Sequence, residues 1–296
     1  MDNLAHTLVG IGIARAGLAQ KYGRGTTLTL AIASNLPDLD SLWSMWSRFD
    51  YFTLRRTHSH ALIAIPVLAA LYVLVARRWL KHIPPGTLFG MAALGVAGHL
   101  LLDLVNAFGV VILWPFSRER FELASVFIID LGVWAIALAP IVAARWLKGD
   151  PRVFRWALAA LVAYLALCTA ARYRAESLVA TPGAVVRVFP EPLGPHRFRA
   201  VVKEGDVYTL SLVRVLSGRV EPRHRFVTHE QSPEVARCRC TPHGRTIDWF
   251  AAAPVWREEP DGSVEVYDLR FKSITIDRPN AFRWRFAPGE TVPVPK

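Results

Sequence analysis

Long apolar stretches fill the first 175 residues of this 296-residue chain, and they must be buried either in a helical bundle or in a bilayer. Four of them have membrane-spanning character, because about 20 apolar residues cross the hydrocarbon core of a bilayer as a helix. They cover residues 61–76, 88–114, 126–146 and 153–171. The pattern therefore predicts four membrane spans.

Two weaker apolar segments, residues 4–20 and 26–46, precede these four. The first contains Gly10, Gly12 and Gly17, where a neighbouring helix can approach closely. The second is broken by Pro37 and two aspartates, which a surrounding bundle would have to shelter. We therefore expect an α-helical membrane bundle of about six apolar helices in residues 1–175.

The composition changes between Arg174 and Pro182, where a segment rich in proline and arginine begins. Beyond it, apolar and charged residues alternate and turn signals recur, a pattern typical of an antiparallel sheet or small sandwich. The predicted strands cover residues 184–189, 198–203, 207–216, 246–251, 264–271 and 282–286. Residues 182–296 are therefore predicted to form a β-rich soluble domain.

The formal charge of +11 raises the possibility of nucleic-acid binding. The basic residues, however, stand at the ends of apolar runs, as Lys21, Arg77 and Arg145 do, rather than in one block. This placement favours anionic lipid headgroups as partners and makes nucleic acid an unlikely one. A small excess of Lys and Arg on the face opposite the polar residues predicts a periplasmic or external C-terminal domain.

Ionisable residues inside apolar segments are costly, so they indicate a functional site by default. If the segments cross the membrane alternately, the starts of the first, third and fifth segments and the ends of the second and fourth lie at the same membrane face. Five segments contribute to this face. The residues are His6, Asp38, Asp40, His58, His60, His99, Asp103 and Asp130. Their convergence predicts a metal site.

Individually, these motifs also have ordinary interpretations. His99 and Asp103 lie four residues apart and so leave one face of a helix, where they can share a metal ion or form a buried hydrogen bond. Asp38 and Asp40 follow Pro37 and can instead cap a helix. The Thr57-His58-Ser59-His60 motif can be an interfacial loop with an N-cap residue.

Imidazole and carboxylate ligands without thiolate suit zinc, manganese or iron, and we expect a divalent ion, zinc first and Mn²⁺ second. The ligand count allows more than one ion. Such a centre can activate water and hydrolyse a phosphate ester. Arg55, Arg56 and Arg118 fall in loops on the same face and can bind phosphate, although interfacial arginines also commonly snorkel to the headgroups.

Several motifs resemble those of bacterial inner-membrane metal-dependent hydrolases, some of which are described as DNA-damage-regulated. The resemblance covers roughly residues 1–150 and is specific in order and spacing. The motifs are Met1 to Gly10, Ser34-Asn35-Leu36-Pro37-Asp38-Leu39-Asp40, Arg55-Arg56-Thr57-His58-Ser59, Gly98-His99 through Asp103, and Trp114-Pro115-Phe116-Ser117. The resemblance implies a multi-pass protein of the bacterial plasma membrane.

A more distant similarity is to the all-helical zinc phospholipases C and single-strand nucleases. It implies that Asp38, His58, His99 and Asp103 complete one metal site and that His6 shares Asp103 in a second. Those secreted enzymes also use a free N-terminal amine and a His…His-x-x-x-Glu group, neither of which we recognise here. Asp40, Asp130 or His60 would have to substitute.

The sequence thus predicts a membrane-bound metal-dependent hydrolase that acts on a phosphoester, in a lipid or lipid-linked substrate, by means of a metal-activated water. The metal-bound water needs no separate base if its pKa falls near neutrality, and Asp40 is otherwise the candidate general base. One alternative is a membrane transporter or stress-response scaffold with a buried His/Asp network. Another is a nucleic-acid binder that uses residues 182–296.

Overall fold

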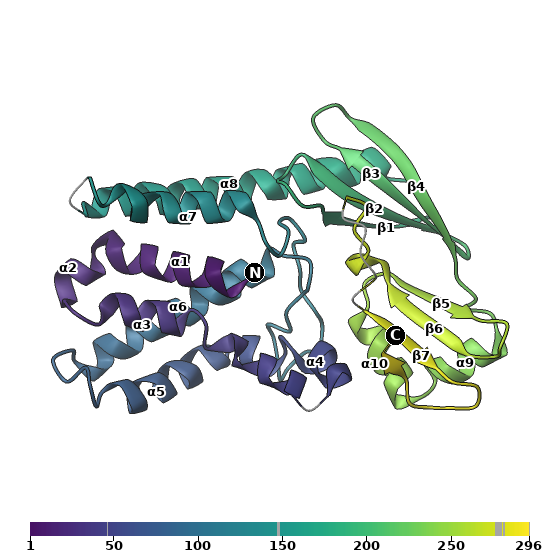
Figure 1. Ribbon diagram of the computed structural model, residues 1–296, viewed down its shortest axis with the longest axis horizontal. Coiled ribbons are helices and arrows are strands. Elements are labelled where there is room, and N and C mark those ends of the chain that lie inside the picture. The colour runs from purple at the N-terminus through teal and green to yellow at the C-terminus, as the bar shows by residue number, and fades with distance from the viewer. Residues whose placement is uncertain (46, 147–148, 276–279, 281, 296) are drawn as a thin grey trace. The chain divides into compact units, whose positions relative to one another are not determined.

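The computed structural model describes residues 1–296 apart from 46, 147–148, 276–279, 281 and 296. The chain divides into two compact units (Figure 1). The helical unit comprises Met1–Met45 and Leu54–Thr169, and the β-rich unit comprises Trp46–Thr53 and Ala170–Lys296. A short segment between residues 45 and 54 therefore belongs with the β-rich unit although helical-unit segments flank it on both sides.

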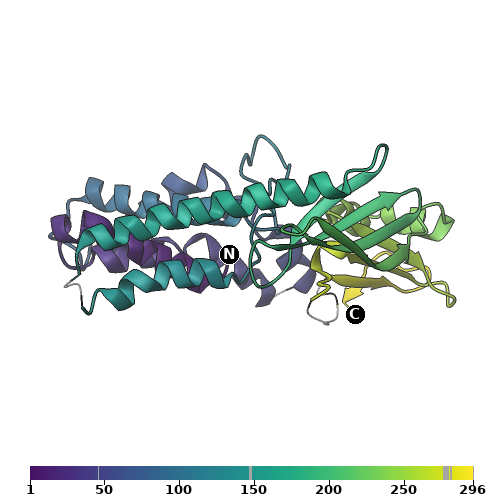
Figure 2. The ribbon, with the colours of Figure 1, turned by 90° about the horizontal axis from the view of Figure 1, so that it is seen from above.

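The helical unit is built from helices joined by turns and, between α6 and α7, by the longer segment 105–130. Its α-helices are α1 Asn3–Ile13, α2 Ala19–Tyr22, α3 Thr26–Ala33, α5 Ala64–Ala76, α6 Pro85–Leu104, α7 Leu131–Ala143 and the first part of α8 Pro151–Val179. A π-helix, Ala14–Leu18, joins α1 to α2, and two 3-10 helices cover Pro37–Met45 and His58–His60. Apolar residues of α1, α7 and α8 form one core, and α7 lies beside α8 in Figures 1 and 2.

The prediction of about six apolar helices with four membrane spans is wrong. Among the described residues, ten α-helices are present, and two of them are long and apolar enough to cross a membrane: α6 and α8. Helices α5 and α7 are apolar but have only 13 residues each. At 1.5 Å per residue each is about 20 Å long, whereas the hydrocarbon core is about 30 Å thick.

The two weak N-terminal segments are shorter still, for local reasons. Gly17 adopts φ 145°, which lies outside helical geometry and interrupts the segment 4–20 between α1 and α2. Helix α3 has eight residues, and Pro37 then opens a 3-10 helix. The predicted end of this segment, Trp46, lies outside the described residues. Apolar composition thus overestimated the length of the regular helices.

Two glycines allow the helices that carry the polar residues to pack closely. A Cβ atom on Gly10 of α1 would lie 2.7 Å from the backbone oxygen of Leu30 in α3. A Cβ atom on Gly95 of α6 would lie 2.8 Å from the Cβ atom of Ala33 in α3. Both separations are shorter than real carbon contacts, so glycine permits the approach of α1, α3 and α6.

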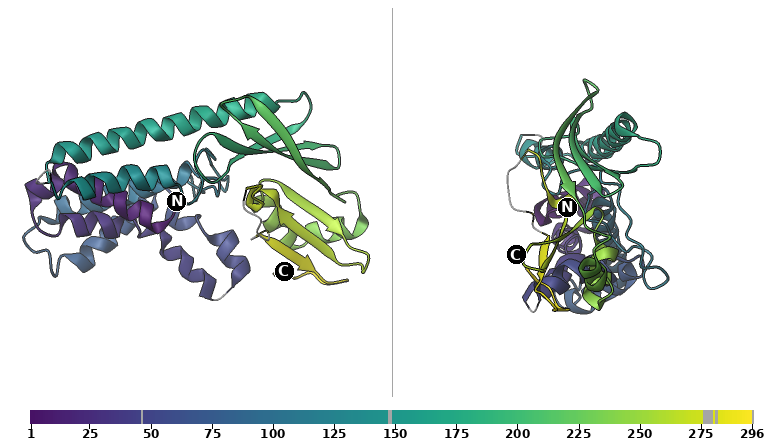
Figure 3. Two further views of the ribbon diagram at one scale, coloured as in Figure 1. Left: turned by 45° about the horizontal axis from the view of Figure 1, so that its top comes forward. Right: turned by 90° about the vertical axis from the view of Figure 1, so that its right-hand side faces the viewer.

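The β-rich unit contains two four-stranded antiparallel sheets, drawn in green and yellow in Figure 3. The first sheet has the order β1 Val185–Pro190, β2 Arg197–Glu204, β3 Val207–Arg214 and β4 Arg219–Val227. The second has the order β5 Pro254–Glu258, β6 Val264–Asp268, β7 Arg283–Phe286 and β8 Val294–Pro295. Helices α9 Pro233–Arg239 and α10 Pro242–Phe250 connect them, a 3-10 helix covers Leu269–Phe271, and α4 Arg48–Leu54 contributes Arg48–Thr53.

The prediction of a β-rich C-terminal part is confirmed by these sheets, but one predicted strand is wrong. Residues 246–251 lie mostly within α10 rather than in a strand. Thr241 caps this helix by accepting a hydrogen bond from the Gly244 amide, and Pro242 occupies its first turn. A threonine cap followed by proline favours helix initiation over the strand pattern of the next residues.

Candidate metal centre

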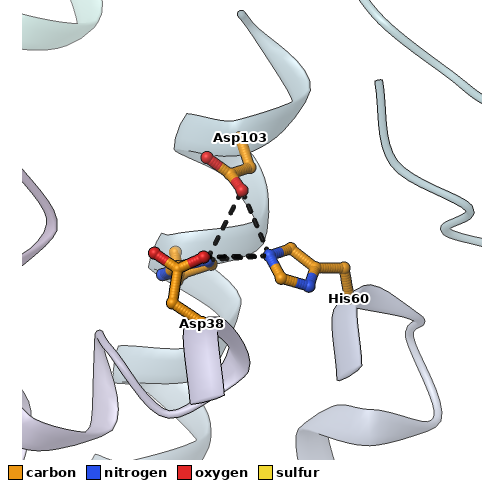
Figure 4. Close-up of side chains that lie close together, drawn as sticks. Asp38, His60 and Asp103 are labelled. Carbon is orange, nitrogen blue, oxygen red and sulfur yellow. Dashed lines mark hydrogen bonds and ion pairs between the residues drawn. The ribbon is translucent and has the colours of Figure 1, made fainter. Parts of the chain in front are cut away.

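Four buried side chains from three separate segments converge in the helical unit. Asp38 comes from the 3-10 helix Pro37–Met45, His60 from the 3-10 helix His58–His60, and His99 and Asp103 from successive turns of α6. One potential ligand atom of each lies within 4.8 Å of the others. Figure 4 shows Asp38, His60 and Asp103 pointing toward one another. All four side chains are buried.

The separations between these atoms suit ligation of one ion. The Nε2 atom of His60 lies 3.1 Å from Nε2 of His99 and 3.1 Å from Oδ2 of Asp103. Nε2 of His99 lies 3.5 Å from Oδ2 of Asp103, and Oδ1 of Asp38 lies 3.8 and 3.9 Å from the two Nε2 atoms. Ligands at about 2.0–2.1 Å from a tetrahedral zinc ion lie about 3.3 Å apart. The cluster therefore has dimensions that fit a divalent ion.

The hydrogen bond of His99 fixes which ring nitrogen faces the cluster. Its Nδ1 atom lies 2.7 Å from the backbone carbonyl oxygen of Ser34. Because a carbonyl oxygen can only accept, Nδ1 must carry the proton and donate it. The Nε2 atom of the neutral ring then presents a lone pair to the cluster, as a metal ligand requires.

The same logic applies to His60 through Asp40. The Ser59 hydroxyl donates to Oδ2 of Asp40 at 2.7 Å, so its oxygen is left to accept from Nδ1 of His60 at 2.9 Å. Nδ1 of His60 also lies 3.3 Å from Oδ2 of Asp40. Nδ1 is therefore the donor, and Nε2 of the neutral ring is an acceptor. A carboxylate behind a histidine is the usual support of a metal-binding imidazole.

Electrostatics reinforce this arrangement around His60. Burial by itself would lower the pKa of His60, but hydrogen bonds and charge attraction from Asp103 and Asp40 outweigh it, so the pKa is raised. Burial would likewise raise the pKa of Asp40, whereas contact with His60 and the Arg56 amide lowers it. The two carboxylates thus favour a protonated His60 ring, and a metal ion at Nε2 would take the place of that proton.

Arginines and the Met1 amino group surround the cluster, but acceptors face one another at its centre. With both neutral rings donating through Nδ1, two Nε2 lone pairs and two carboxylates face one another at its centre. Within the described part of the chain, Oδ2 of Asp38 is buried without a hydrogen-bond partner, and so is Nδ1 of His6. Buried acceptors without donors are unfavourable unless a cation or proton lies between them. This imbalance fits a bound divalent metal ion.

Asp103 also contacts groups outside the four-residue cluster. Its Oδ1 atom forms an ion pair with the amino group of Met1 and accepts from the Asn106 amide at 3.2 Å. Its Oδ2 atom lies 2.9 Å from Nε of Arg56, whose side chain is completely buried. Burial lowers the pKa of the Met1 amino group to about 6, even though the charge of Asp103 opposes this effect. Asp103 thus links the cluster to the Met1 amino group, Arg56 and Asn106.

His6 adjoins the centre from α1. Its Nε2 atom lies 3.3 Å from Oδ1 of Asp103, and its ring stacks on His99 with centroids 3.7 Å apart. Burial lowers the pKa of His6 from 6.5 to about 3, so the ring is neutral at physiological pH. Because a carboxylate oxygen only accepts, Nε2 of the neutral His6 ring is the nitrogen that can donate to Asp103, which leaves the lone pair on Nδ1.

Sequence interpretation singled out His58 as the ligand, but the structure brings His60 into the cluster instead. His58 is exposed, packs edge-on against Trp114 with ring centroids 4.7 Å apart and lies 3.0 Å from the Thr57 hydroxyl through Nδ1. The 3-10 helix has about three residues per turn, so side chains two apart point in different directions. Only one of these two histidines can then face Asp103.

The structure does not bring Asp130 or Arg118 into the cluster either. Asp130 caps α7 by accepting from the Val133 amide at 2.9 Å, and it accepts from the Tyr164 hydroxyl at 2.9 Å. Asp130 stands at the start of α7, as the sequence predicted, but its carboxylate caps this helix instead of facing the cluster. Arg118 is exposed on the loop that follows α6.

The other two predicted phosphate ligands lie at the centre. Nη2 of Arg55 lies 3.2 Å from Oδ1 of Asp38, and the side chain is 13% exposed. Arg56 is buried against Asp103 and adopts φ 60°, a strained conformation for a residue with a side chain. Arg55 can therefore reach a ligand from the rim, whereas Arg56 neutralises charge from within.

Three groups at the centre were missed from the sequence: the Met1 amino group, Asn106 and the Ser34 carbonyl. Asn106 lies three residues after Asp103, and this spacing on a helical turn could have pointed to it. Ser34 contributes its backbone carbonyl, which every residue has, so its residue type could not indicate this contact. The Met1 contact depends on tertiary packing alone.

The chain was compared with known protein families, curated proteins and solved structures. No curated protein and no solved structure matches the chain. Residues 1–175, which contain the whole cluster, match the sequence model of the YdjM inner membrane protein family. This match covers more than half of the chain and agrees with two helices that are long and apolar enough to span a membrane. The chain therefore belongs to the YdjM inner membrane protein family.

Proposed function

We propose that this chain is a membrane-bound metal-dependent hydrolase that acts on a phosphoester. The observation that carries the proposal is the meeting of two imidazole Nε2 atoms, 3.1 Å apart, with Asp38 and Asp103 in a buried site. Asp38, His60, His99 and Asp103 would hold the ion, with zinc first and manganese second by ligand type. A divalent ion in such a site supplies Lewis acidity for attack of water on a phosphate ester.

The residues around the ligands have distinct roles in this proposal. Asp40 and Ser59 hold His60 in the tautomer that binds metal, so Asp40 is a positioning residue rather than the general base expected from the sequence. Arg56 balances the charge of Asp103 from within the protein. Arg55, on the rim, can attract and orient the negative charge of a phosphoryl group beside Asp38.

A lipid or lipid-linked phosphoester is the substrate class that suits this location. His99 and Asp103 lie in the C-terminal half of α6, one of the two candidate spans, so the centre lies near one membrane surface. By helical rise, His99 and Asp103 lie about 21 and 27 Å along α6 from Pro85. Phosphate headgroups are the esters present at that depth, whereas a soluble substrate would have to reach a membrane-embedded site.

We propose a multi-pass orientation with the centre facing the periplasm. Exposed basic residues gather at the opposite ends of the helices, where three exposed tryptophans accompany them. They are Lys21, Arg24, Arg77, Arg78, Lys81, Arg145, Arg152, Trp79, Trp146 and Trp156. Basic residues favour the cytoplasmic side, and tryptophan favours the interface. Because α8 starts at this end, the β-rich unit would follow on the periplasmic side.

Metal content and hydrolysis of the purified full-length chain test the function. We expect about one or more equivalents of zinc or manganese by elemental analysis, and hydrolysis of a nitrophenyl phosphodiester or a phospholipid that a chelator abolishes. His99→Ala should remove the metal and the activity while the protein still inserts into the membrane. A wild-type chain that takes up neither ion after incubation with each of them would defeat the proposal.

A reporter that is active only in the periplasm, fused after Lys296, tests the orientation separately. We expect an active fusion in bacterial cells. A matched fusion between Arg78 and Lys81, in the loop that joins α5 to α6, should be inactive because this loop lies at the basic end. The reverse pattern would overturn the orientation without affecting the metal assignment.

A further inference from the structure

Helix α4 connects the two short segments that supply ligands to the candidate metal centre. Asp38 and Asp40 lie in the 3-10 helix that ends at Met45, and His60 lies in the 3-10 helix that begins at His58. Between them, residues 46–53 belong to the β-rich unit. The chain thus leaves the metal centre, passes through α4 within the β-rich unit and returns to the metal centre.

The docking of α4 is aromatic. The ring of Phe52 lies 5.6 Å from that of Phe282 and 6.2 Å from that of Phe271, and Phe250 completes this group at 6.3 Å. One turn earlier, Phe49 lies 5.3 Å from Trp284. Edge-to-face pairs at these separations are favourable. Helix α4 is therefore attached to the β-rich unit by its own aromatic side chains.

The chain segments on either side of α4, which we call its two arms, are joined by hydrogen bonds close to the ligands. Oδ2 of Asp40 accepts from the backbone amide of Arg56 at 2.8 Å and from the hydroxyl of Ser59 at 2.7 Å. Arg55, the residue after α4, pairs with Asp38. A displacement of α4 would therefore act on both arms at once, and through them on Asp38 and on the ring of His60.

The ligand segments themselves are poorly suited to hold a fixed geometry alone. Both are 3-10 helices, which have weaker hydrogen-bond geometry than α-helices and are usually short. Metal affinity depends on groups that orient the ligands, and losing one costs about 10–100-fold. Anchoring of α4 within the β-rich unit is a means of restraining these segments.

We propose that the β-rich unit controls the metal affinity of the centre through α4. This inference rests on the proposed metal centre and assigns a role to the β-rich unit, with Phe52 as a positioning residue. Loss of the Phe52 anchor releases the arms that carry Asp38 and His60. The ion is then held less tightly, although no ligand has changed.

The test is zinc affinity of the full-length protein in detergent, measured by competition with a chromophoric chelator. We expect Phe52→Ala to weaken zinc binding about tenfold or more, and Phe52→Tyr to restore most of the affinity. Phe226→Ala is the matched control, because Phe226 is an aromatic residue of the same unit that packs against Tyr267. We expect wild-type affinity from this control.

Thermal unfolding establishes which variants are folded, and Phe52→Leu, which keeps apolar bulk but loses the ring, replaces Phe52→Ala if that variant does not fold. Wild-type affinity in the folded variant would overturn the coupling, and so would an equal loss in Phe226→Ala. If the wild-type chain binds no zinc or manganese, the metal centre itself fails. The two failures are therefore distinguishable.

Discussion

Both units bury groups of charged side chains, but the two groups differ in how their hydrogen bonds are satisfied. In the β-rich unit, Glu191, Arg199, Asp268 and Arg270 are each at most 5% exposed. In the helical unit, Asp38, His60, His99 and Asp103 are buried to a similar degree. The two groups are therefore similarly buried but differ in the hydrogen-bond partners of their side chains.

The ionic group of the β-rich unit supplies its own donors. Glu191 pairs with Arg199 and accepts from the Ser273 hydroxyl at 2.7 Å. Asp268 accepts from the backbone amides of Ala252 and Ala253, each at 3.0 Å. Each carboxylate meets a guanidinium or backbone amides, so this group needs no ligand. Asp38 and Asp103 also meet arginines, but the helical group differs in that two imidazole Nε2 atoms lie 3.1 Å apart beside these carboxylates, an arrangement that a proton or a cation between them would stabilise.

The largest expected effect is the loss of metal from a single histidine change. His60→Ala should reduce bound metal to less than about a tenth of the wild-type content, because it removes a ligand and leaves a gap between His99 and Asp103. Elemental analysis of the purified variant measures this. His58→Ala, two residues away, is the matched control and should keep its metal. Metal loss from His58→Ala alone would restore the assignment made from the sequence.

A change in the β-rich group should have the opposite profile. Arg199→Met leaves Glu191 buried without its partner and should destabilise the β-rich unit by about 3–5 kcal/mol, with metal content unchanged. Denaturant unfolding of the full chain, followed by tryptophan fluorescence, measures the stability. The double variant with Glu191→Leu should recover much of the loss, because no unpaired charge remains. Metal loss in Arg199→Met would show that the two groups are not independent.

These contrasts explain which parts of the candidate site could be predicted from the sequence. The four-residue spacing of His99 and Asp103 identified a shared helix face, because α-helical periodicity is regular. The argument from six alternating spans also grouped Asp38 and His6 with them; the structure has both there, although only two helices among the described residues are long enough to span a membrane. Regular helical periodicity therefore accounts for the pairing of His99 with Asp103.

The choice between His58 and His60 could not be predicted in the same way. It depends on the rotation of a three-residue 3-10 helix, which tertiary contacts such as Asp40 with Ser59 determine. The break in the helix at Gly17 and the helix at residues 242–250 escaped prediction for related reasons. Glycine geometry and a Thr-Pro cap overrode hydrophobic patterns there.

A smaller effect should follow from changing a group behind a ligand. Asp40→Asn keeps the shape of the side chain but weakens its hold on Nδ1 of His60, and zinc affinity should fall about 10–100-fold. Chelator competition measures the change, with total metal capacity still close to that of the wild type. If activity falls while zinc affinity stays unchanged, Asp40 acts as a base rather than as a positioning residue.

The smallest effect is expected at Asp130, which the sequence placed among the metal ligands. In the structure its carboxylate caps α7 and accepts from Tyr164, so Asp130→Ala should cost about 1 kcal/mol of stability, in the range of lost helix caps. Zinc affinity should be unchanged, because no atom of Asp130 belongs to the described cluster. Thermal unfolding and chelator competition on one preparation separate the two roles. A fall in zinc affinity comparable to that of Asp40→Asn would contradict this assignment. It would mean that Asp130 influences the ion although none of its atoms lies in the cluster.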